Sequence, residues 1–232
     1  MKGTYQMIIN IRGALGTQIF EYIHGLTIAK SKNQTVEEVH INVSGAIVET
    51  AKVDWISSII EMPYPVKAVE SSAKQGVWSN PLNFANMINS KVMEDLVCRI
   101  EPIKSDDEIL HIRGKDRKIA SIDDYVSLMD MIGTNVKLVG DDNILIEETI
   151  RKAGFGKNVS ENALTDWARL MGCKKVYCAF TNYPLSALIF SPNTEINMLS
   201  RNNSNGYVTI DERAYSCVDV LFREYLKNGR WI

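Results

Sequence analysis

The sequence predicts an α/β protein whose chain forms two halves, each built around a parallel sheet. Short apolar runs alternate with longer segments whose apolar residues recur at helical spacing, a pattern typical of parallel β-α-β units. A charged stretch at residues 104–108 interrupts this pattern and indicates a domain boundary. We therefore expect a first half over residues 1–105 and a second half over residues 106–232.

The first half begins with a predicted strand that runs into a glycine turn. Residues 7–11 are apolar, and the next five residues contain Gly13 and Gly16. A helix should follow, because Ile19, Ile23 and Leu26 lie on one helical face. Further expected elements are a strand at 39–43, a helix at 55–60, a short strand at 66–69 and a helix at 87–99.

The second half alternates more regularly. We expect strands at residues 109–112, 136–139 and 175–180, and helices at 124–132, 144–153, 161–171, 185–190 and 215–226, with Gly154 ending the second helix. Ligands of parallel sheets bind beyond the carboxyl ends of the strands. The loops that follow these strands are therefore the places to seek a site.

Composition excludes several classes of protein. The 232 residues carry 26 Lys plus Arg and 28 Asp plus Glu, and this balance disfavours a nonspecific nucleic-acid binder. No apolar run approaches the roughly 18 residues of a membrane span, and the N-terminus lacks a secretory signal, so we expect a soluble, unprocessed, cytoplasmic protein. The four scattered cysteines do not suggest a metal site, and Cys173 and Cys178 are expected to be buried free thiols.

Cations follow the predicted strand at 109–112. Arg113 and Lys115 could neutralise the charge that builds on a nucleotide diphosphate as it leaves, a stabilisation that grows in the transition state. The alternative is an ordinary solvated loop. His111 lies within the strand, where a histidine on its own is more often structural than catalytic.

Polar residues also follow the next two strands. Asp141 and Asp142 could accept hydrogen bonds from a base or a ribose, although Asp142 could equally cap the following helix. Thr181 and Asn182 precede a helix and would suit a phosphate, or could merely cap that helix.

The glycine turn at residues 13–16 would let the backbone approach an anion or a sugar closely. It lacks the third glycine of a dinucleotide fingerprint and the lysine of a P-loop. Neither of those nucleotide sites is therefore supported.

These loops together resemble the ordered motifs of the α-1,2-fucosyltransferase family and its superfamily. Residues 12–22, R-G-A-L-G-T-Q-I-F-E-Y, resemble the family's G-G-L-G-N-Q-M-F-Q-Y, and residues 111–116, H-I-R-G-K-D, are similar to its H-x-R-R-G-D. Residues 139–142 resemble F-S-D-D, and residues 166–173 resemble D-L-x-x-M-S-x-C. Of the last motif, N-S-T-F-S-W-W, only Thr181 is kept, and Gly114 stands where the family has its second arginine.

The resemblance implies a GT-B architecture of two facing Rossmann-like halves, with the donor nucleotide held mainly by the second half. It implies inverting, metal-independent transfer of fucose or a related deoxysugar from a nucleotide diphosphate sugar, most simply a GDP-sugar, to a glycan hydroxyl, without a further cofactor. Arg113 would stabilise the leaving diphosphate, and Lys115 would supply the charge of the arginine that Gly114 replaces. The residues expected to bind the donor are His111, Arg113, Lys115, Asp141, Asp142, Thr181, Asn182, Gly13, Gly16 and Gln18.

A carboxylate could act as general base for the acceptor, and Asp116 and Glu21 are candidates by position. One alternative is a catalytically silent nucleotide-sugar or glycan binding module descended from such an enzyme. An unrelated α/β hydrolase is disfavoured, because the chain has neither a G-x-S-x-G elbow nor an H-E-x-x-H pair. A structural interaction protein would show no ligand-dependent stabilisation.

Overall fold

The computed structural model describes residues 6–43, 53–70, 92, 95–114, 120–179, 181–191, 194–201 and 208–210. The predicted site residues Lys115 and Asp116, and the predicted helix at 215–226, lie outside these ranges. The chain divides into two compact units, Met1–Glu101 and Pro102–Ile232. This division falls a few residues before the boundary predicted from the charged stretch.

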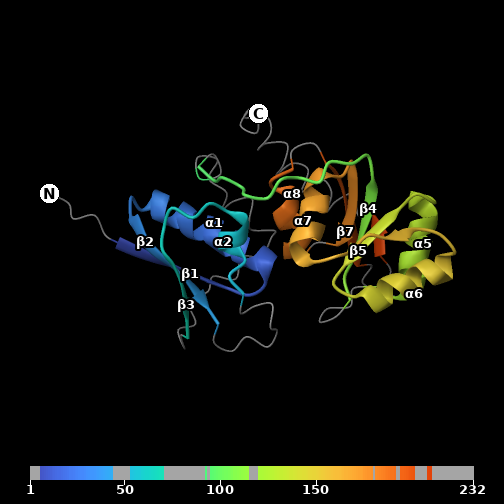
Figure 1. Ribbon diagram of the computed structural model, residues 1–232, viewed down its shortest axis with the longest axis horizontal. Helices are drawn as coiled ribbons and strands as arrows, with labels where there is room; N and C mark the ends of the chain where they lie inside the picture. The colour runs from blue at the N-terminus through green and yellow to red at the C-terminus, as the bar shows by residue number, and fades with distance from the viewer. Residues whose placement is uncertain are drawn as a thin grey trace. The chain divides into compact units, whose positions relative to one another are not determined.

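The first unit contains a parallel sheet of order β1-β2-β3 (Figure 1). Its elements are β1 (Gln6–Arg12), α1 (Leu15–Ser31), β2 (Thr35–Asn42), α2 (Ile56–Ile59) and β3 (Val66–Val69). Ile9 pairs with Val39 and Ile11 pairs with Ile41, and all four side chains are buried. Gly25 of α1 lies so close to β1 that a Cβ there would come within 2.5 Å of Ile9 Cγ2. A glycine in the middle of α1 therefore lets this helix pack directly onto the sheet.

The helix predicted over residues 87–99 is wrong at its C-terminal end. Residues 95–100 are not helical, and Cys98 forms an antiparallel bridge with Ile60. The backbone N–H groups of Glu61 and Arg99 donate to Val97 O at 2.8 Å and Ile59 O at 2.7 Å. This pairing with the chain after α2 satisfies backbone groups that a local helix would otherwise have satisfied.

The second unit contains a six-stranded sheet of order β6-β5-β4-β7-β8-β9, parallel except for the last pair. Its strands are β4 (Glu108–Ile112), β5 (Lys137–Gly140), β6 (Lys157–Asn158), β7 (Lys175–Ala179), β8 (Glu195–Arg201) and β9 (Val208–Ile210). Its helices are α5 (Ile122–Ile132), α6 (Asn143–Ala153), α7 (Ala163–Gly172) and α8 (Asn182–Leu188). After β4 the chain winds outward through β5 and β6, then returns to place β7 on the other side of β4. Such a reversal is where open parallel sheets bind ligands.

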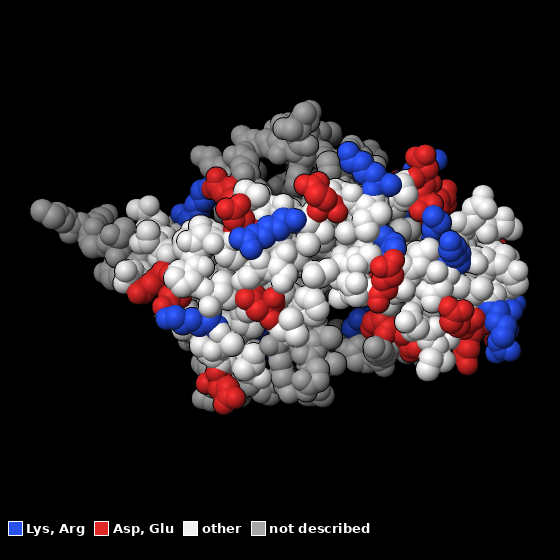
Figure 2. All heavy atoms as spheres, viewed as in Figure 1, with Lys and Arg blue, Asp and Glu red and all other residues white. Residues whose placement is uncertain are grey.

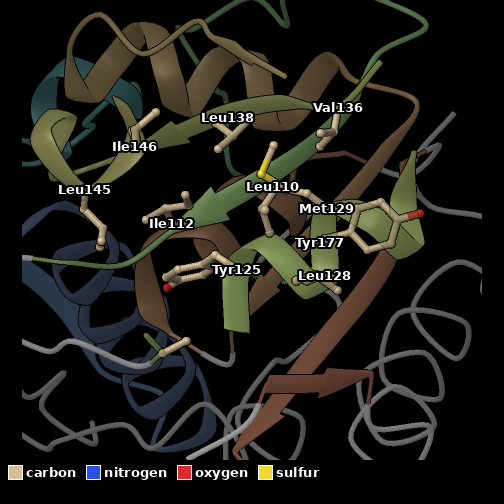
Figure 3. Close-up of a cluster of buried hydrophobic side chains, with 11 residues drawn as sticks. Leu110, Ile112, Tyr125, Leu128, Met129, Val136, Leu138, Leu145, Ile146 and Tyr177 are labelled. Atoms are coloured by element: carbon tan, nitrogen blue, oxygen red, sulfur yellow. The ribbon is translucent and has the colours of Figure 1, made fainter. Parts of the chain in front are cut away.

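The core of this unit packs the neighbouring strands β4 and β5 against two helices. Leu110, Ile112 and Leu138 of the sheet pack with Tyr125 and Met129 of α5 (Figure 3). Leu145 and Ile146 of α6 belong to the same buried cluster. The cluster thereby sets the positions of the two loops that leave β4 and β5.

The helix ends follow local sequence signals. Ser121 and Asp124 form a reciprocal capping box on α5, and Asn162 accepts from the N–H groups of Leu164 and Thr165 on α7. Gly154 ends α6 in the left-handed conformation with φ 78°, as predicted. The strands β6, β8 and β9 were not predicted. For β8, Glu195, Ile196 and Asn197 alternate polar with apolar, which is a strand signal.

None of the helices in the described ranges combines the length and apolarity needed to cross a membrane. Cys173 and Cys178 are buried free thiols, which confirms that prediction. On the face drawn in Figure 2, positive and negative side chains are interspersed. This distribution agrees with the small formal net charge of -2.

Candidate functional site

Arg113 and Asp141 meet where β4 and β5 end. Arg113 Nη1 lies 2.6 Å from Asp141 Oδ2, and the backbone N–H of Gly114 donates to Asp141 Oδ1 at 2.9 Å. One carboxylate thus holds both a guanidinium and the backbone of the neighbouring residue. Both side chains are only partly buried, at 22% and 27% exposure, so the guanidinium is fixed and still accessible to a ligand.

Tyr125 of α5 holds the backbone of the same arginine. Its hydroxyl accepts from the Arg113 N–H at 3.2 Å and donates to the Arg113 carbonyl at 3.3 Å. The ring is buried in the cluster of Figure 3, and burial raises the pKa of this phenol to about 12. Sequence reasoning missed Tyr125, because a tyrosine in the first turns of an amphipathic helix signals only core packing.

Gly114 permits a close approach between the two loops. A Cβ at this position would lie 2.4 Å from Asp142 Cβ, and a Cβ on Gly140 would lie 2.2 Å from the carbonyl oxygen of Ile112. Asp142 accepts from the N–H of Leu145 at 3.1 Å and caps α6, which is the local role that the sequence left open. Gly114, which stands where the motif of the sequence resemblance has its second arginine, is therefore required by the packing of these two loops.

His111 is buried at 2% exposure, and its Nδ1 has no hydrogen-bond partner within the described part of the chain. Burial first, and the nearby charge of Arg113 second, lower its pKa to about 3. The imidazole is therefore neutral at pH 7. It can give or accept a hydrogen bond, but it cannot supply positive charge to a phosphate.

Thr181 and Tyr183 lie after β7, the strand beside β4. Thr181 occupies the N-cap position of α8, yet its buried hydroxyl makes no hydrogen bond to any described residue. Asn182 is the first residue of α8. The Tyr183 ring lies 5.6 Å from the His111 ring between centroids, and its hydroxyl donates to Ala163 O at 2.5 Å. Tyr183 thus covers one side of His111, and no pattern in the sequence had indicated it.

A second carboxylate network supports the loop after β5. Ser160 donates to Gly140 O at 3.0 Å and lies 2.5 Å from Asp166 Oδ2, while the N–H of Glu161 donates to Asp166 Oδ1 at 2.9 Å. Asp166 is buried, and desolvation raises its pKa. This network ties the N-terminus of α7 to the loop that carries Asp141.

In the first unit, the Gln18 side chain binds backbone groups around the glycine turn, and the donor-binding role predicted for it stays a prediction. Its amide nitrogen donates to Gly13 O and Val53 O, both at 2.8 Å, and its amide oxygen accepts from the N–H groups of Trp55 at 3.1 Å and Ile56 at 3.3 Å. The side chain is fully buried. Both donors and both acceptor positions of the amide therefore bind backbone groups.

Replacing Gln18 by leucine is expected to destabilise the protein by about 3 kcal/mol or more, because one buried and three partly buried backbone groups lose their partner. Urea unfolding measures the change, with Gln6→Leu at an exposed position of β1 as the control. A loss similar to that of Gln6→Leu would contradict the structural role.

Glu21 lies beneath the glycine turn. Its Oε2 accepts from the Arg12 N–H at 2.7 Å, and its Oε1 lies 3.7 Å from Arg12 Nε. The carboxyl is 2% exposed, and desolvation raises its pKa to about 7 against the opposing effect of Arg12. Gly13 has φ 81°, and Gly16 is buried in the first turn of α1. Glu21 and Gly16 are buried, whereas Gly13 has a left-handed backbone conformation and is partly exposed.

Comparison with known proteins finds likeness in solved structures alone. No protein-family model matches the sequence, and no curated protein matches it. The chain is similar to the crystal structure of the fucosyltransferase NodZ from Bradyrhizobium, with a TM-score of 0.52, 11% identity, and coverage of 90% of this chain and 98% of that chain. It is also similar to NodZ alpha-1,6-fucosyltransferase soaked with GDP-fucose, with a TM-score of 0.53, 12% identity, and coverage of 89% and 98%.

A further structure, NodZ alpha-1,6-fucosyltransferase co-crystallized with GDP, matches with a TM-score of 0.50, 11% identity, and coverage of 90% and 98%. At these identities the likeness concerns the fold. It confirms the predicted fold class, an α/β chain with two parallel sheets of the GT-B-like kind. The α-1,2 subtype of the sequence resemblance receives no support from these α-1,6 neighbours.

Proposed function

We propose that this chain is a glycosyltransferase that moves fucose or a related deoxysugar from a nucleotide diphosphate, most simply GDP, to a glycan hydroxyl. The observation that carries the proposal is the Arg113 guanidinium, fixed by Asp141 at the carboxyl end of β4 where the strand order reverses. A fixed and accessible cation at such a place suits an anionic nucleotide. The GDP and GDP-fucose named for the structural neighbours support the choice of nucleotide.

The proposed reaction is an inverting displacement without a metal. The acceptor hydroxyl oxygen attacks the anomeric carbon, the bond from that carbon to the diphosphate oxygen breaks, and its electron pair stays on the diphosphate. Arg113 stabilises the charge that develops there, and because Asp141 and Tyr125 already hold it, little reorganisation is needed. The neutral His111 and the Thr181 hydroxyl would contribute hydrogen bonds to the donor.

The acceptor's proton passes to a base. Asp116 is our proposed base, since Glu21 is engaged with the backbone of Arg12 and buried from solvent. Lys115 is proposed to supply the second positive charge of the site. Asp142 is proposed to act on the donor indirectly, through the close packing of its loop against Gly114.

A thermal-shift series tests the nucleotide assignment. GDP is expected to raise the melting temperature more than UDP, ADP, CMP or dTDP, with no change on adding EDTA. At a concentration about 100-fold above Kd, the stabilisation is about 2.7 kcal/mol. Equal or absent shifts for all five nucleotides would sink the proposal.

A catalytically silent binding module is the second candidate. It is favoured by the packing at Gly114, which leaves no room for the second arginine of the family motif. Incubation with GDP-fucose and a mixture of oligosaccharides separates the two. Release of GDP supports the transferase, and the linkage of its product decides between α-1,2 and α-1,6 transfer. Tight donor binding with no GDP release supports the module.

A further inference from the structure

Tyr183 of α8 contacts a predicted site residue but has no part in the proposed reaction. Its ring lies 5.6 Å from the His111 ring between centroids, with an angle of 30° between the two planes. His111 belongs to β4 and Tyr183 follows β7, and these strands are neighbours in the sheet. The contact therefore lies at the reversal of strand order, beside the strand that leads to Arg113.

Helix α7 holds both the ring and the backbone of Tyr183. The Tyr183 hydroxyl donates to the carbonyl oxygen of Ala163, the first residue of α7, at 2.5 Å. The Tyr183 carbonyl accepts from Ser186 Oγ at 2.7 Å, and Ser186 Oγ accepts from Trp167 Nε1 at 3.0 Å. Ser186 and Trp167 are fully buried. Tyr183 is thus attached to one helix at two points, which fixes the position of its ring.

The imidazole of His111 is held differently. Its side chain is 2% exposed, and its Nδ1 has no hydrogen-bond partner among the described residues. The Thr181 hydroxyl is also buried and makes no hydrogen bond within the described ranges. A buried polar atom without a partner is costly, unless a ligand supplies the partner on binding. One such atom lies in the ring that Tyr183 contacts, and the other lies two residues before Tyr183.

We propose that Tyr183 is a positioning residue, whose ring fixes the plane of the His111 imidazole so that its unpartnered nitrogen can bind the donor nucleotide. The inference rests on the proposed function and adds to it a residue that acts through His111. An imidazole nitrogen makes its hydrogen bond in the plane of the ring, so the contact that sets this plane also sets the direction of the bond. Ring packing leaves both nitrogens available, whereas a hydrogen bond from the protein would occupy one of them.

Both rings are uncharged at pH 7. Burial first, and the charge of Arg113 second, lower the pKa of His111 to about 3. Burial first, and then the carboxylates of Asp166 and Asp141, raise the pKa of Tyr183 well above its ordinary value. No hydrogen bond from the described residues to Nδ1 fixes the tautomer of the imidazole. It can therefore present either a lone pair or an N–H to the nucleotide.

Two replacements of Tyr183 separate positioning from stability. Tyr183→Leu removes the ring and should weaken GDP binding about fivefold, the contribution of one neutral hydrogen bond. Tyr183→Phe loses the bond to Ala163 O but keeps the ring, and its backbone is still held through Ser186. It should therefore melt at a lower temperature than the parent and yet bind GDP equally well. Thermal unfolding and isothermal titration with GDP measure the two effects.

Tyr177→Leu is the matched control, because Tyr177 is also a buried tyrosine of the second unit. Its hydroxyl donates to Glu108 Oε2 at 3.0 Å, at the amino end of β4 and away from Arg113. The variant should be less stable with unchanged GDP affinity. In a His111→Leu background, Tyr183→Leu should cause no further loss of affinity, since Tyr183 acts through the bond that His111 makes.

A measurement without nucleotide keeps this inference separate from the proposed function. Carbon-13 relaxation of the His111 ring should show a rigid imidazole in the parent and in Tyr183→Phe, and a mobile one in Tyr183→Leu. Equal rigidity in all three proteins would overturn the proposal. A parent protein that binds no nucleotide would remove the proposed function, and the relaxation data would still decide whether Tyr183 holds His111.

Two results of the titrations would also overturn the proposal. One is a loss of GDP affinity in Tyr183→Phe as large as that in Tyr183→Leu. The other is an undiminished effect of Tyr183→Leu in the His111→Leu background. If His111→Leu fails to fold, the comparison of Tyr183→Phe with Tyr183→Leu decides.

Discussion

Arg113→Ala is expected to weaken GDP binding by about 100-fold, which corresponds to about 2.7 kcal/mol. Charge-assisted hydrogen bonds to a phosphate contribute about this much when the donor is already held in place. Here the guanidinium is held by Asp141 at 2.6 Å, and its backbone is held by the Tyr125 hydroxyl. Isothermal titration of GDP into both proteins measures the change.

Two further variants separate charge from geometry at this position. Arg113→Lys keeps the charge but lacks the planar fork, so most of the affinity should still be lost. Asp141→Asn keeps the shape of its residue while weakening the hold on the guanidinium, and a smaller loss is expected. Arg151→Ala, in the last turn of α6, is the matched control. An Arg113→Ala protein that binds GDP as the parent does would remove the basis of the proposed function.

Gly114→Arg is expected to abolish donor binding, although by sequence it would restore the family motif. The new Cβ would fall 2.4 Å from Asp142 Cβ and 2.8 Å from Asp142 Oδ2, so the loops after β4 and β5 must separate. Separation breaks the bond from the Gly114 N–H to Asp141 and releases Arg113. Overpacking of this kind costs about 1–3 kcal/mol of folding stability. Urea unfolding and GDP titration measure the two losses separately.

Two further changes test whether the contact between a new Cβ at position 114 and Asp142 causes these losses. Gly114→Ala should lose stability and affinity in the same direction as Gly114→Arg. Adding Asp142→Gly should recover part of the affinity, because it removes the atoms that the new Cβ meets. This change also removes the side-chain cap of α6, which costs only about a few tenths of a kcal/mol when glycine takes the N-cap position. If Gly114→Arg binds GDP more tightly than the parent, the close packing of the two loops is not a constraint on function.

Local signals in the sequence were sufficient for most elements of the second unit. The alternation of strand and helix, the cap formed by Asp142 and the left-handed Gly154 all depend on residues close together in the chain. The same signals did not predict segments whose backbone groups pair with residues far away in the sequence. Residues 95–100 join Ile60 and the chain after α2, so their own residues do not decide their conformation.

The same distinction between local sequence and tertiary packing applies to the candidate site. The order of the loops and their residue types, with Arg113 after one strand and Asp141 after the next, can be read from the sequence and is the basis of the proposed chemistry. Only the tertiary structure decided that Asp141 binds Arg113, that Tyr125 clamps its backbone, and that Gln18 and Glu21 face inward. These residues are separated by up to dozens of positions, and packing between elements brings them together. Whether a polar side chain meets a ligand or a backbone depends on that packing, which no local pattern specifies.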